Sequence, residues 1–179
     1  MKKDIILIGP VGAGKSTIGK LLSEKLGFPQ ASLDDIRWEI YKERECGYDF
    51  ELADKIEEEK GFLGLYRYWK PFEAYSVERV LKLYSGHIHD FGAGQSVYEN
   101  EELFKKVQKN LDPYPNIVLL LPSENKERCL QILFERTKFE HNSLFINNSS
   151  NQKLAKIIVY TDGKNLKEIM EEIIRKIKL

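Results

Sequence analysis

The chain is built from short apolar runs that alternate with longer segments in which apolar residues recur at helical spacing. This order is typical of α/β proteins, in which strands alternate with helices. Five runs predict strands, at residues 4–8, 28–32, 86–91, 116–121 and 157–160. Because the first and fourth runs are almost continuously apolar, we expect those two strands to be buried on both faces. The predicted fold is a three-layer α/β sandwich around a five-stranded parallel sheet, with strand 4–8 at its centre.

Apolar residues at helical spacing predict the rest of the regular structure. The predicted helices cover residues 15–26, 34–44, 51–60, 67–84, 99–111, 124–138, 151–156 and 166–177. Pro71 is expected to interrupt the helix at 67–84, because proline removes a backbone donor and clashes with the preceding turn. The polar run at 147–151 is predicted to form a loop, short enough to serve as a lid hinge.

Length and composition restrict the class of protein. A chain of 179 residues is the size of one α/β domain with a single core, so we expect one domain over residues 1–179. Its 28 basic and 28 acidic residues balance, so no global charge favours nucleic acid or an anionic membrane as a partner. No apolar stretch approaches the roughly 18 residues that span a bilayer. We expect a cytoplasmic protein that binds a small molecule at a local site; the sequence does not fix its oligomeric state.

The two cysteines and three histidines carry little chemistry in this pattern. Cys46 and Cys129 lie far apart without metal-ligand spacing, so free thiols are expected. His87 and His89 alternate on the predicted third strand, but no spaced third ligand accompanies them, which disfavours a metal site there.

Residues 9–16, Gly-Pro-Val-Gly-Ala-Gly-Lys-Ser, match the phosphate-binding loop pattern G-x-x-x-x-G-K-[ST] in full, after a predicted strand and before a predicted helix. Glycines allow the loop to present backbone N–H groups to phosphates, and the helix that follows directs its positive end at them. Lys15 should reach the β- and γ-phosphates of ATP, and Ser16 should hold Mg²⁺. The residues expected to bind the nucleotide are Gly9, Gly12, Ala13, Gly14, Lys15, Ser16 and Thr17. The sequence therefore predicts a P-loop NTPase fold, with ATP and Mg²⁺ as cofactors.

Asp34 follows the predicted second strand, at the sheet edge where open α/β proteins bind ligands. A carboxylate there can accept the proton of an acceptor hydroxyl group, so Asp34 is the candidate catalytic carboxylate. Capping of the following helix by Asp34 is an alternative use of the same residue. Asp35 is a second candidate for contact with the acceptor.

The predicted third strand ends at Asp90 and runs into a glycine-rich turn. Asp90 stands where a P-loop enzyme can place a second magnesium carboxylate. Gly92, Ala93 and Gly94 would let the backbone approach an acceptor closely, although a sharp turn alone would also explain them.

The order of these motifs resembles the shikimate kinase family, within the nucleoside monophosphate kinase-like P-loop proteins. The resemblance implies that Lys15 and Ser16 are the phosphate lysine and the magnesium serine, and that Asp34 orients the acceptor hydroxyl group. It also implies that residues 92–94 are the family's three-glycine turn, with alanine in place of one glycine. The ending at 159–164 is similar to the family's last strand and its nucleotide-side loop.

The chain departs from the family pattern on the acceptor side. Ser32 stands where the family has a second aspartate. The family's acceptor-carboxylate arginine, expected near the start of the third helix, is not apparent around residues 69–73, where Lys70 is the only cation. A lysine cannot reproduce the bidentate fork of an arginine. Residues 147–155 contain no arginine at all. These departures make shikimate a less favoured acceptor than another small hydroxylated molecule.

The region at about 34–84 is predicted to bind the acceptor, and a lid is predicted at about 135–150. Arg136 is our candidate for the charge-stabilising lid cation, with Lys138 second; a solvated basic helix end is the alternative. The aromatic residues between 62 and 75 are expected to be packing residues, with one or two lining the acceptor pocket.

The predicted function is transfer of the γ-phosphoryl group of Mg·ATP to a hydroxyl group of a small metabolite, as in the shikimate kinase family. One alternative is a nucleoside, gluconate or polynucleotide kinase, which the sequence Asp-Asp-Ile-Arg at 34–37 also resembles. The other is a nucleotide-binding regulator with a degraded acceptor site.

Overall fold

The computed structural model describes residues 3–179, so the first two residues of the predicted domain lie outside the described residues. All five predicted strands form, and they make one parallel sheet in the order β2-β3-β1-β4-β5. The strands are β1 (Ile5–Ile8), β2 (Gln30–Ser32), β3 (Ile88–Asp90), β4 (Asn116–Leu121) and β5 (Ile157–Tyr160). The prediction of a five-stranded parallel sheet with the first strand at its centre is confirmed.

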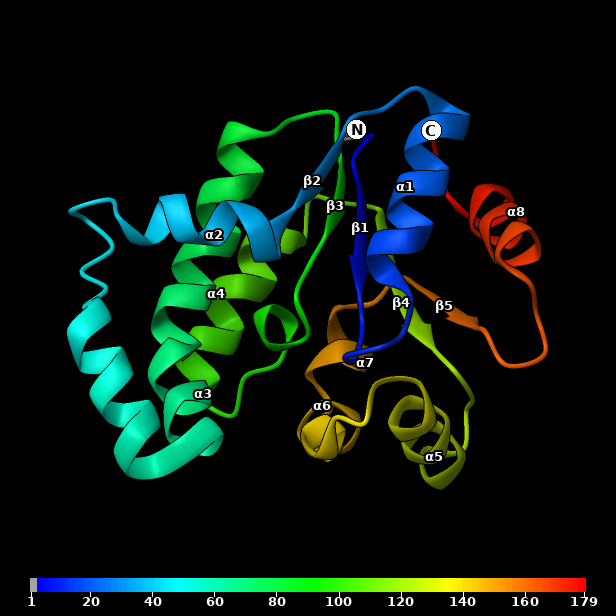
Figure 1. Cartoon of the computed structure of the whole chain (residues 1–179). Coiled ribbons are helices and arrows are strands. Elements are labelled where there is room, and N and C mark those ends of the chain that lie inside the picture. Colours follow the sequence, from blue (N-terminus) through cyan, green and yellow to red (C-terminus); the bar gives the residue numbers. More distant parts are fainter. Residues whose placement is uncertain (1–2) are drawn as a thin grey trace.

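Helices connect the strands and cover both faces of the sheet (Figure 1). The α-helices are α1 (Lys15–Leu26), α2 (Leu33–Tyr41), α3 (Phe50–Leu83), α4 (Glu101–Leu111), α5 (Lys126–Thr137), α6 (Ser143–Asn147), α7 (Ser150–Leu154) and α8 (Leu166–Lys176). Two short 3₁₀ helices are η1 (Ala93–Ser96) and η2 (Glu140–Asn142). Among the described residues, no helix is long and apolar enough to cross a bilayer.

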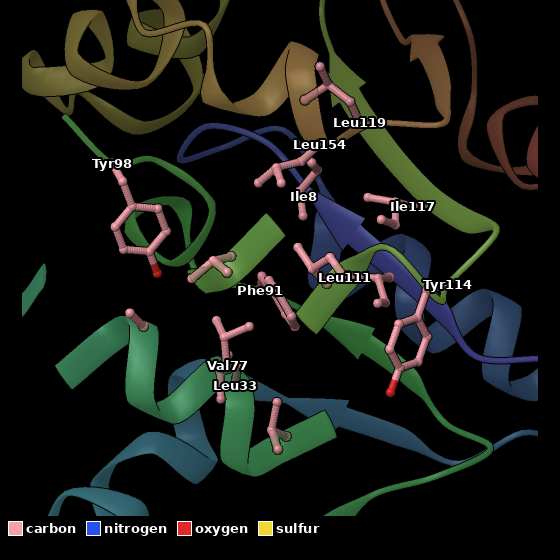
Figure 2. Close-up of a cluster of buried hydrophobic side chains, with 14 of the residues drawn as sticks. Ile8, Leu33, Val77, Phe91, Tyr98, Leu111, Tyr114, Ile117, Leu119 and Leu154 are labelled. Atoms are coloured by element: carbon pink, nitrogen blue, oxygen red, sulfur yellow. The ribbon is translucent and has the colours of Figure 1, made fainter. Parts of the chain in front are cut away.

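Successive residues of the central strand point to opposite layers, as the continuous apolar run predicted. Ile6 and Ile8 belong to a buried cluster with residues of α3, α4 and α5, including Val77 of α3. Ile5 and Leu7 belong to a second cluster with α1 and α8. Figure 2 shows Ile8 in the first cluster together with Val77 and Phe91. Two cores separated by the sheet confirm the three-layer sandwich.

Helix α3 differs from the prediction, which placed two helices at 51–60 and 67–84. The helical stretch runs from Phe50 to Leu83, with a kink at Gly61, whose φ of 60° is favourable only for glycine. Pro71 lies inside the helix and does not interrupt it, so that prediction is wrong. Its ring is exposed, and the apolar residues of α3 that follow, such as Ala74 and Val77, pack into the first core and hold the helix across the lost hydrogen bond.

The predicted polar loop at 147–151 is also wrong in its second half. Helix α7 begins at Ser150, and both Ser150 and Asn151 are buried. Ser150 Oγ donates to the carbonyl oxygen of Tyr98 at 3.2 Å, and Ser96 Oγ donates to Asn151 Oδ1 at 2.7 Å. Ser150 and Asn151 are therefore polar because they bond to the chain after β3, whereas Asn147 and Ser149 face solvent.

Candidate active site

The phosphate-binding loop connects β1 to α1 at the carboxyl edge of the sheet. Gly9, Gly12 and Gly14 have φ values of 143°, 81° and 92°, which other residues rarely adopt. Gly14 immediately precedes Lys15, the first residue of α1. The glycines thus turn the chain sharply enough to place the positive end of α1 directly below the loop.

Lys15 lies folded back against its own loop. Its Nζ donates to the carbonyl oxygens of Gly9 at 2.9 Å and Pro10 at 2.8 Å. Burial lowers the pKa of Lys15 to about 8, and the carboxylates of Asp34 and Asp90 oppose this fall only in part. The ammonium group therefore has two weak carbonyl partners that a phosphate could replace.

Asp90 ends β3 beside the phosphate-binding loop, as predicted for a second magnesium carboxylate. Strands β1 and β3 are neighbours in the sheet, and their pairing brings Asp90 to Ser16, whose Oγ donates to Asp90 Oδ1 at 3.1 Å. Ser32 Oγ donates to the same oxygen at 3.1 Å, and Gln30 Nε2 donates to Oδ2. Ser32, at the position of the family's second aspartate, is therefore a hydrogen-bond partner of Asp90.

This arrangement fits Mg²⁺. A hydroxyl oxygen and a carboxylate oxygen lie together, and Mg²⁺ is commonly held by one or two such protein ligands, with water and phosphate oxygens completing an octahedron. Within residues 3–179, no group of three or more His, Cys, Asp or Glu side chains could hold a metal ion. The protein would therefore hold the ion through Ser16 and Asp90 only together with the nucleotide.

Asp34 is the second residue of α2 and does not cap it. The N-cap position is Ser32, and no side chain caps this helix end. The carboxylate of Asp34 is 58% exposed and lies against Gly92, where a Cβ atom would collide with its Oδ1. The capping alternative is therefore wrong, and a side chain at position 92 would displace the carboxylate of Asp34 from this place.

The other residues of the glycine turn serve neighbouring side chains. A Cβ atom at Gly94 would collide with the carboxylate of Glu73. Ala93 begins η1 and does not have a positive φ, so alanine fits there without strain. The replacement of one family glycine by Ala93 thus leaves the turn intact.

Two hollows meet at the carboxyl edge of the sheet. One, of about 270 Å³, lies over the phosphate-binding loop and is lined by Gly12, Gly14, Lys15, Ser16, Thr17, Asp34 and Ala93, among others. The other, of about 590 Å³, is lined by Ser16, Lys20, Gln30, Ser32, Asp34, Asp35 and Ile36. Ser16 and Asp34 line both, so the expected phosphate site and the candidate catalytic carboxylate share one space.

The predicted lid folds over the phosphate-binding loop. Arg136, at the end of α5, extends Nη1 to within 3.4 Å of the carbonyl oxygen of Gly12. Lys138 instead lies over the ring of Phe134. Phe139 and Phe145 pack with Val11 of the loop in a third apolar cluster. Of the two candidate lid cations, the structure brings Arg136 to the loop.

Comparison with known proteins identifies the family. Over 180 residues, 98% of each chain, the protein is 31% identical to a shikimate kinase from Sulfurihydrogenibium sp. (strain YO3AOP1). The chain belongs to the shikimate kinase family. A shikimate kinase from Francisella tularensis subsp. novicida is 47% identical over 60 residues, which are 34% of this chain and 31% of that protein. No protein-family model matches the chain.

Solved structures agree on the fold of this shikimate kinase family member. The shikimate kinase from Acinetobacter baumannii in complex with shikimate gives a TM-score of 0.66 at 18% identity, covering 99% of this chain and 97% of that one. The enzyme from Aquifex aeolicus gives 0.58 at 24% identity, covering 96% and 94%. A gluconokinase from Sinorhizobium meliloti gives 0.52 at 17% identity, covering 97% and 90%. The predicted P-loop NTPase fold is confirmed, and the family is one of small-molecule kinases that phosphorylate an alcohol group, the class we predicted.

Lys70, our candidate for the family's acceptor cation, is engaged by the protein itself. Its Nζ donates to Glu73 Oε2 at 2.6 Å and to the carbonyl oxygens of Gly94 and Val97 at 2.8 and 3.1 Å. The nitrogen also lies 4.0 Å from the ring centroid of Tyr66. Both charged side chains are buried. In this arrangement Lys70 joins α3 to the glycine turn and has no donor directed at an acceptor, which speaks against the role that we predicted.

Arg37, to which the sequence motifs assigned no role, lies beside Asp34. The two side chains face each other at 3.9 Å between Arg37 Nη1 and Asp34 Oδ1. A signal was available, because residues three positions apart on a helix share a face. Arg37 is thus a cation at the acceptor end of this shikimate kinase family member, at a position the family comparison gave no reason to consider.

Proposed function

We propose that this protein is an ATP-dependent phosphotransferase that moves the γ-phosphoryl group of Mg·ATP to a hydroxyl group of a small metabolite. The observation that carries this proposal is the shared space at Ser16 and Asp34. A phosphate on the loop and a hydroxyl group on Asp34 would meet there in one hollow. Membership in the shikimate kinase family supports the same activity.

In the proposed mechanism, the residues of the site mainly position the reacting groups and neutralise the charge of the phosphates. Lys15 exchanges its carbonyl partners for the β- and γ-phosphate oxygens. Asp34 accepts a hydrogen bond from the acceptor hydroxyl group and orients its oxygen toward the γ-phosphorus. It takes the hydroxyl proton as the new P–O bond forms and the bond from the γ-phosphorus to the β–γ bridging oxygen breaks, which releases ADP. Mg²⁺, when bound near Ser16 and Asp90, would neutralise charge on the phosphates. Arg136, already at the loop, is placed to balance charge that develops on the transferred group.

Shikimate and gluconate are the first acceptors to consider, because proteins named for them share this fold. The balanced net charge of the chain weighs against a polynucleotide acceptor. A regulator that binds nucleotide without an acceptor reaction remains the competing function, and one measurement separates the two.

The test is acceptor-dependent release of ADP from Mg·ATP, measured by a coupled assay. The panel contains shikimate, gluconate, nucleosides and simple hydroxy acids, each compared with the acceptor-free rate. The proposal predicts a rate well above that background for at least one acceptor, with mass spectrometry showing one added phosphate. Lys15→Ala is the control for contaminating kinases. A background rate with every acceptor, despite demonstrated nucleotide binding, would favour the regulator.

A further inference from the structure

The side chain of Arg37 is largely buried, and its Nε has no hydrogen-bond partner. The side chain is only 15% exposed, and Nε is inaccessible and unpaired. No hydrogen bond from Arg37 to another residue of the described chain is present, although its guanidinium group carries five N–H donors. The two Nη groups are not among the inaccessible atoms, so their N–H donors can reach a partner that enters from solvent.

Two tryptophan rings lie next to this guanidinium group. Arg37 Cζ lies 4.4 Å from the ring centroid of Trp38 and 4.9 Å from that of Trp69. Trp69 is itself held, because its Nε1 donates to the hydroxyl oxygen of Tyr48 at 3.0 Å. Arginine stacks on aromatic rings through its faces and donates through its edge. The aromatic contacts therefore leave the N–H donors free.

The free edge is close to the candidate catalytic carboxylate. Arg37 Nη1 is 3.9 Å from Asp34 Oδ1, which is too far for a hydrogen bond. The two groups come from neighbouring turns of α2. Lys70, the other cation considered for this end, is held by Glu73, Gly94 and Val97. Arg37 is thus the arginine placed to bind an anion beside a hydroxyl group held by Asp34.

We propose that Arg37 binds an anionic group of the phosphoryl acceptor, a carboxylate or a phosphate, while Asp34 orients the hydroxyl group that is phosphorylated. This inference rests on the proposed function and narrows its substrate class. With hydrogen bonds of about 2.7–2.9 Å to side-chain atoms that are 3.9 Å apart, the anionic oxygen and the reacting hydroxyl oxygen lie at most roughly 9–10 Å apart. The acceptor is then a small hydroxy acid or hydroxyalkyl phosphate whose two groups are separated by a few carbon atoms.

The chain supplies its own optical probe for this site. It contains two tryptophans, and both stack on Arg37. A ligand that binds the guanidinium edge should therefore change the intrinsic fluorescence. The probes are two matched pairs at constant ionic strength: shikimate with its methyl ester, and glycerol 3-phosphate with glycerol. The first pair tests a carboxylate, whose charge the ester masks with a methyl group, and the second tests a phosphate, which glycerol lacks altogether.

Arg37→Gln is compared with the wild-type protein in the presence of Mg·ADP. We expect a saturable fluorescence change with at least one anionic probe, a much weaker response to its neutral partner, and affinity lowered about 10- to 100-fold in the variant. Arg37→Lys should recover only part of the loss, because an ammonium group lacks the planar fork. Arg79→Gln is the matched control: Arg79 makes a bidentate pair with Glu43 and should not affect the anion.

Turnover separates this inference from the function on which it rests. In the ADP-release assay, Arg37→Gln should raise KM for anionic acceptors about 10- to 100-fold and leave KM for neutral acceptors unchanged. If neutral acceptors are phosphorylated as well as anionic ones, or the variant binds the anions normally, the inference is overturned while the kinase function stands. If anions bind through Arg37 but no acceptor supports ADP release, the proposed function fails and the anion site remains. A circular dichroism spectrum and melting curve for each variant verify folding.

Discussion

Asn142, in the predicted lid, holds Val11 of the phosphate-binding loop through both ends of its amide group. Asn142 Oδ1 accepts the backbone N–H of Val11 at 3.0 Å, and Nδ2 donates to the carbonyl oxygen of Val11 at 3.2 Å. Asn142 is 2% exposed, so water cannot readily replace these bonds. The lid and the loop are therefore joined by a specific buried contact as well as by the apolar cluster around Phe139.

Replacement of Asn142 by leucine should destabilise the protein by about 1–3 kcal/mol, because both backbone groups of Val11 lose their partner in a buried place. The free energy of unfolding is measured by urea denaturation, and the dependence of that free energy on urea concentration should be the same in variant and wild type. Asn147→Leu, an exposed neighbour with the same chemical change, is the matched control and should stay within about 0.5 kcal/mol of wild type. Equal stability of the two variants would show that the contact does not hold the lid.

Binding of Mg·ADP or Mg·ATP should raise the melting temperature, since a ligand at about 100 times its Kd adds roughly 2.7 kcal/mol. For a chain of this length the increase should be roughly 5–11 °C. Lys15→Ala should remove most of it, because Lys15 is the cation that replaces its carbonyl partners by phosphate. The absence of any shift at millimolar nucleotide would be incompatible with a working phosphate-binding loop.

Nucleotide affinity should depend on pH through Lys15. Its pKa is lowered to about 8 by burial, and bound phosphates favour the charged form and raise that pKa. Affinity should then be highest below the lowered pKa, fall by up to about tenfold per pH unit as the pH rises through it, and level off above the pKa of the complex. Titration calorimetry at pH 7–9.5 in two buffers of different ionisation enthalpy should also detect proton uptake near pH 8. An arginine at position 15 stays charged over this pH range, so Lys15→Arg should abolish the pH dependence of nucleotide affinity. A wild-type affinity that does not change with pH would contradict this prediction.

Most of the fold could be predicted from sequence because its signals are local. The continuous apolar run before the glycine loop identifies the central strand, and the alternation of Ile5 with Ile6 between two cores follows from the geometry of a strand. The phosphate-binding loop is a contiguous motif, and its glycines take the φ values that the motif requires. Asp90 reaches Ser16 because parallel neighbouring strands end at the same edge.

The acceptor end could not be predicted in the same way, because its contacts join distant positions. Arg37 stacks on Trp69, which is brought to it by the packing of α2 on α3. Lys70 looked available in the sequence, yet its environment is set by Glu73 and by the turn after β3. Nothing in the sequence distinguishes Asn142 from the other residues of its polar segment, because only the folded chain places it against Val11.

The structural role of Lys70 can be tested through its partner Glu73. Lys70→Met alone should destabilise the protein by about 3–5 kcal/mol, because a buried carboxylate is left without its cation. Adding Glu73→Leu removes the unpaired charge and should restore much of the stability. The double-mutant cycle is measured by chemical denaturation. If Lys70→Met keeps wild-type stability but raises KM for an acceptor, Lys70 is an acceptor ligand after all.

The central claim is that Asp34 orients and deprotonates an acceptor hydroxyl group, and Asp34→Asn tests it most directly. Asp34 neither caps α2 nor is buried, so the substitution should leave stability and Mg·ADP affinity nearly unchanged. The decisive measurement is kcat for acceptor-dependent ADP release, with the best acceptor, in wild type and variant. We predict a fall of roughly 10²–10⁴-fold, the usual contribution of a positioned general base. A variant within about threefold of wild-type turnover, well short of that range, would contradict the account and transfer the role to another group.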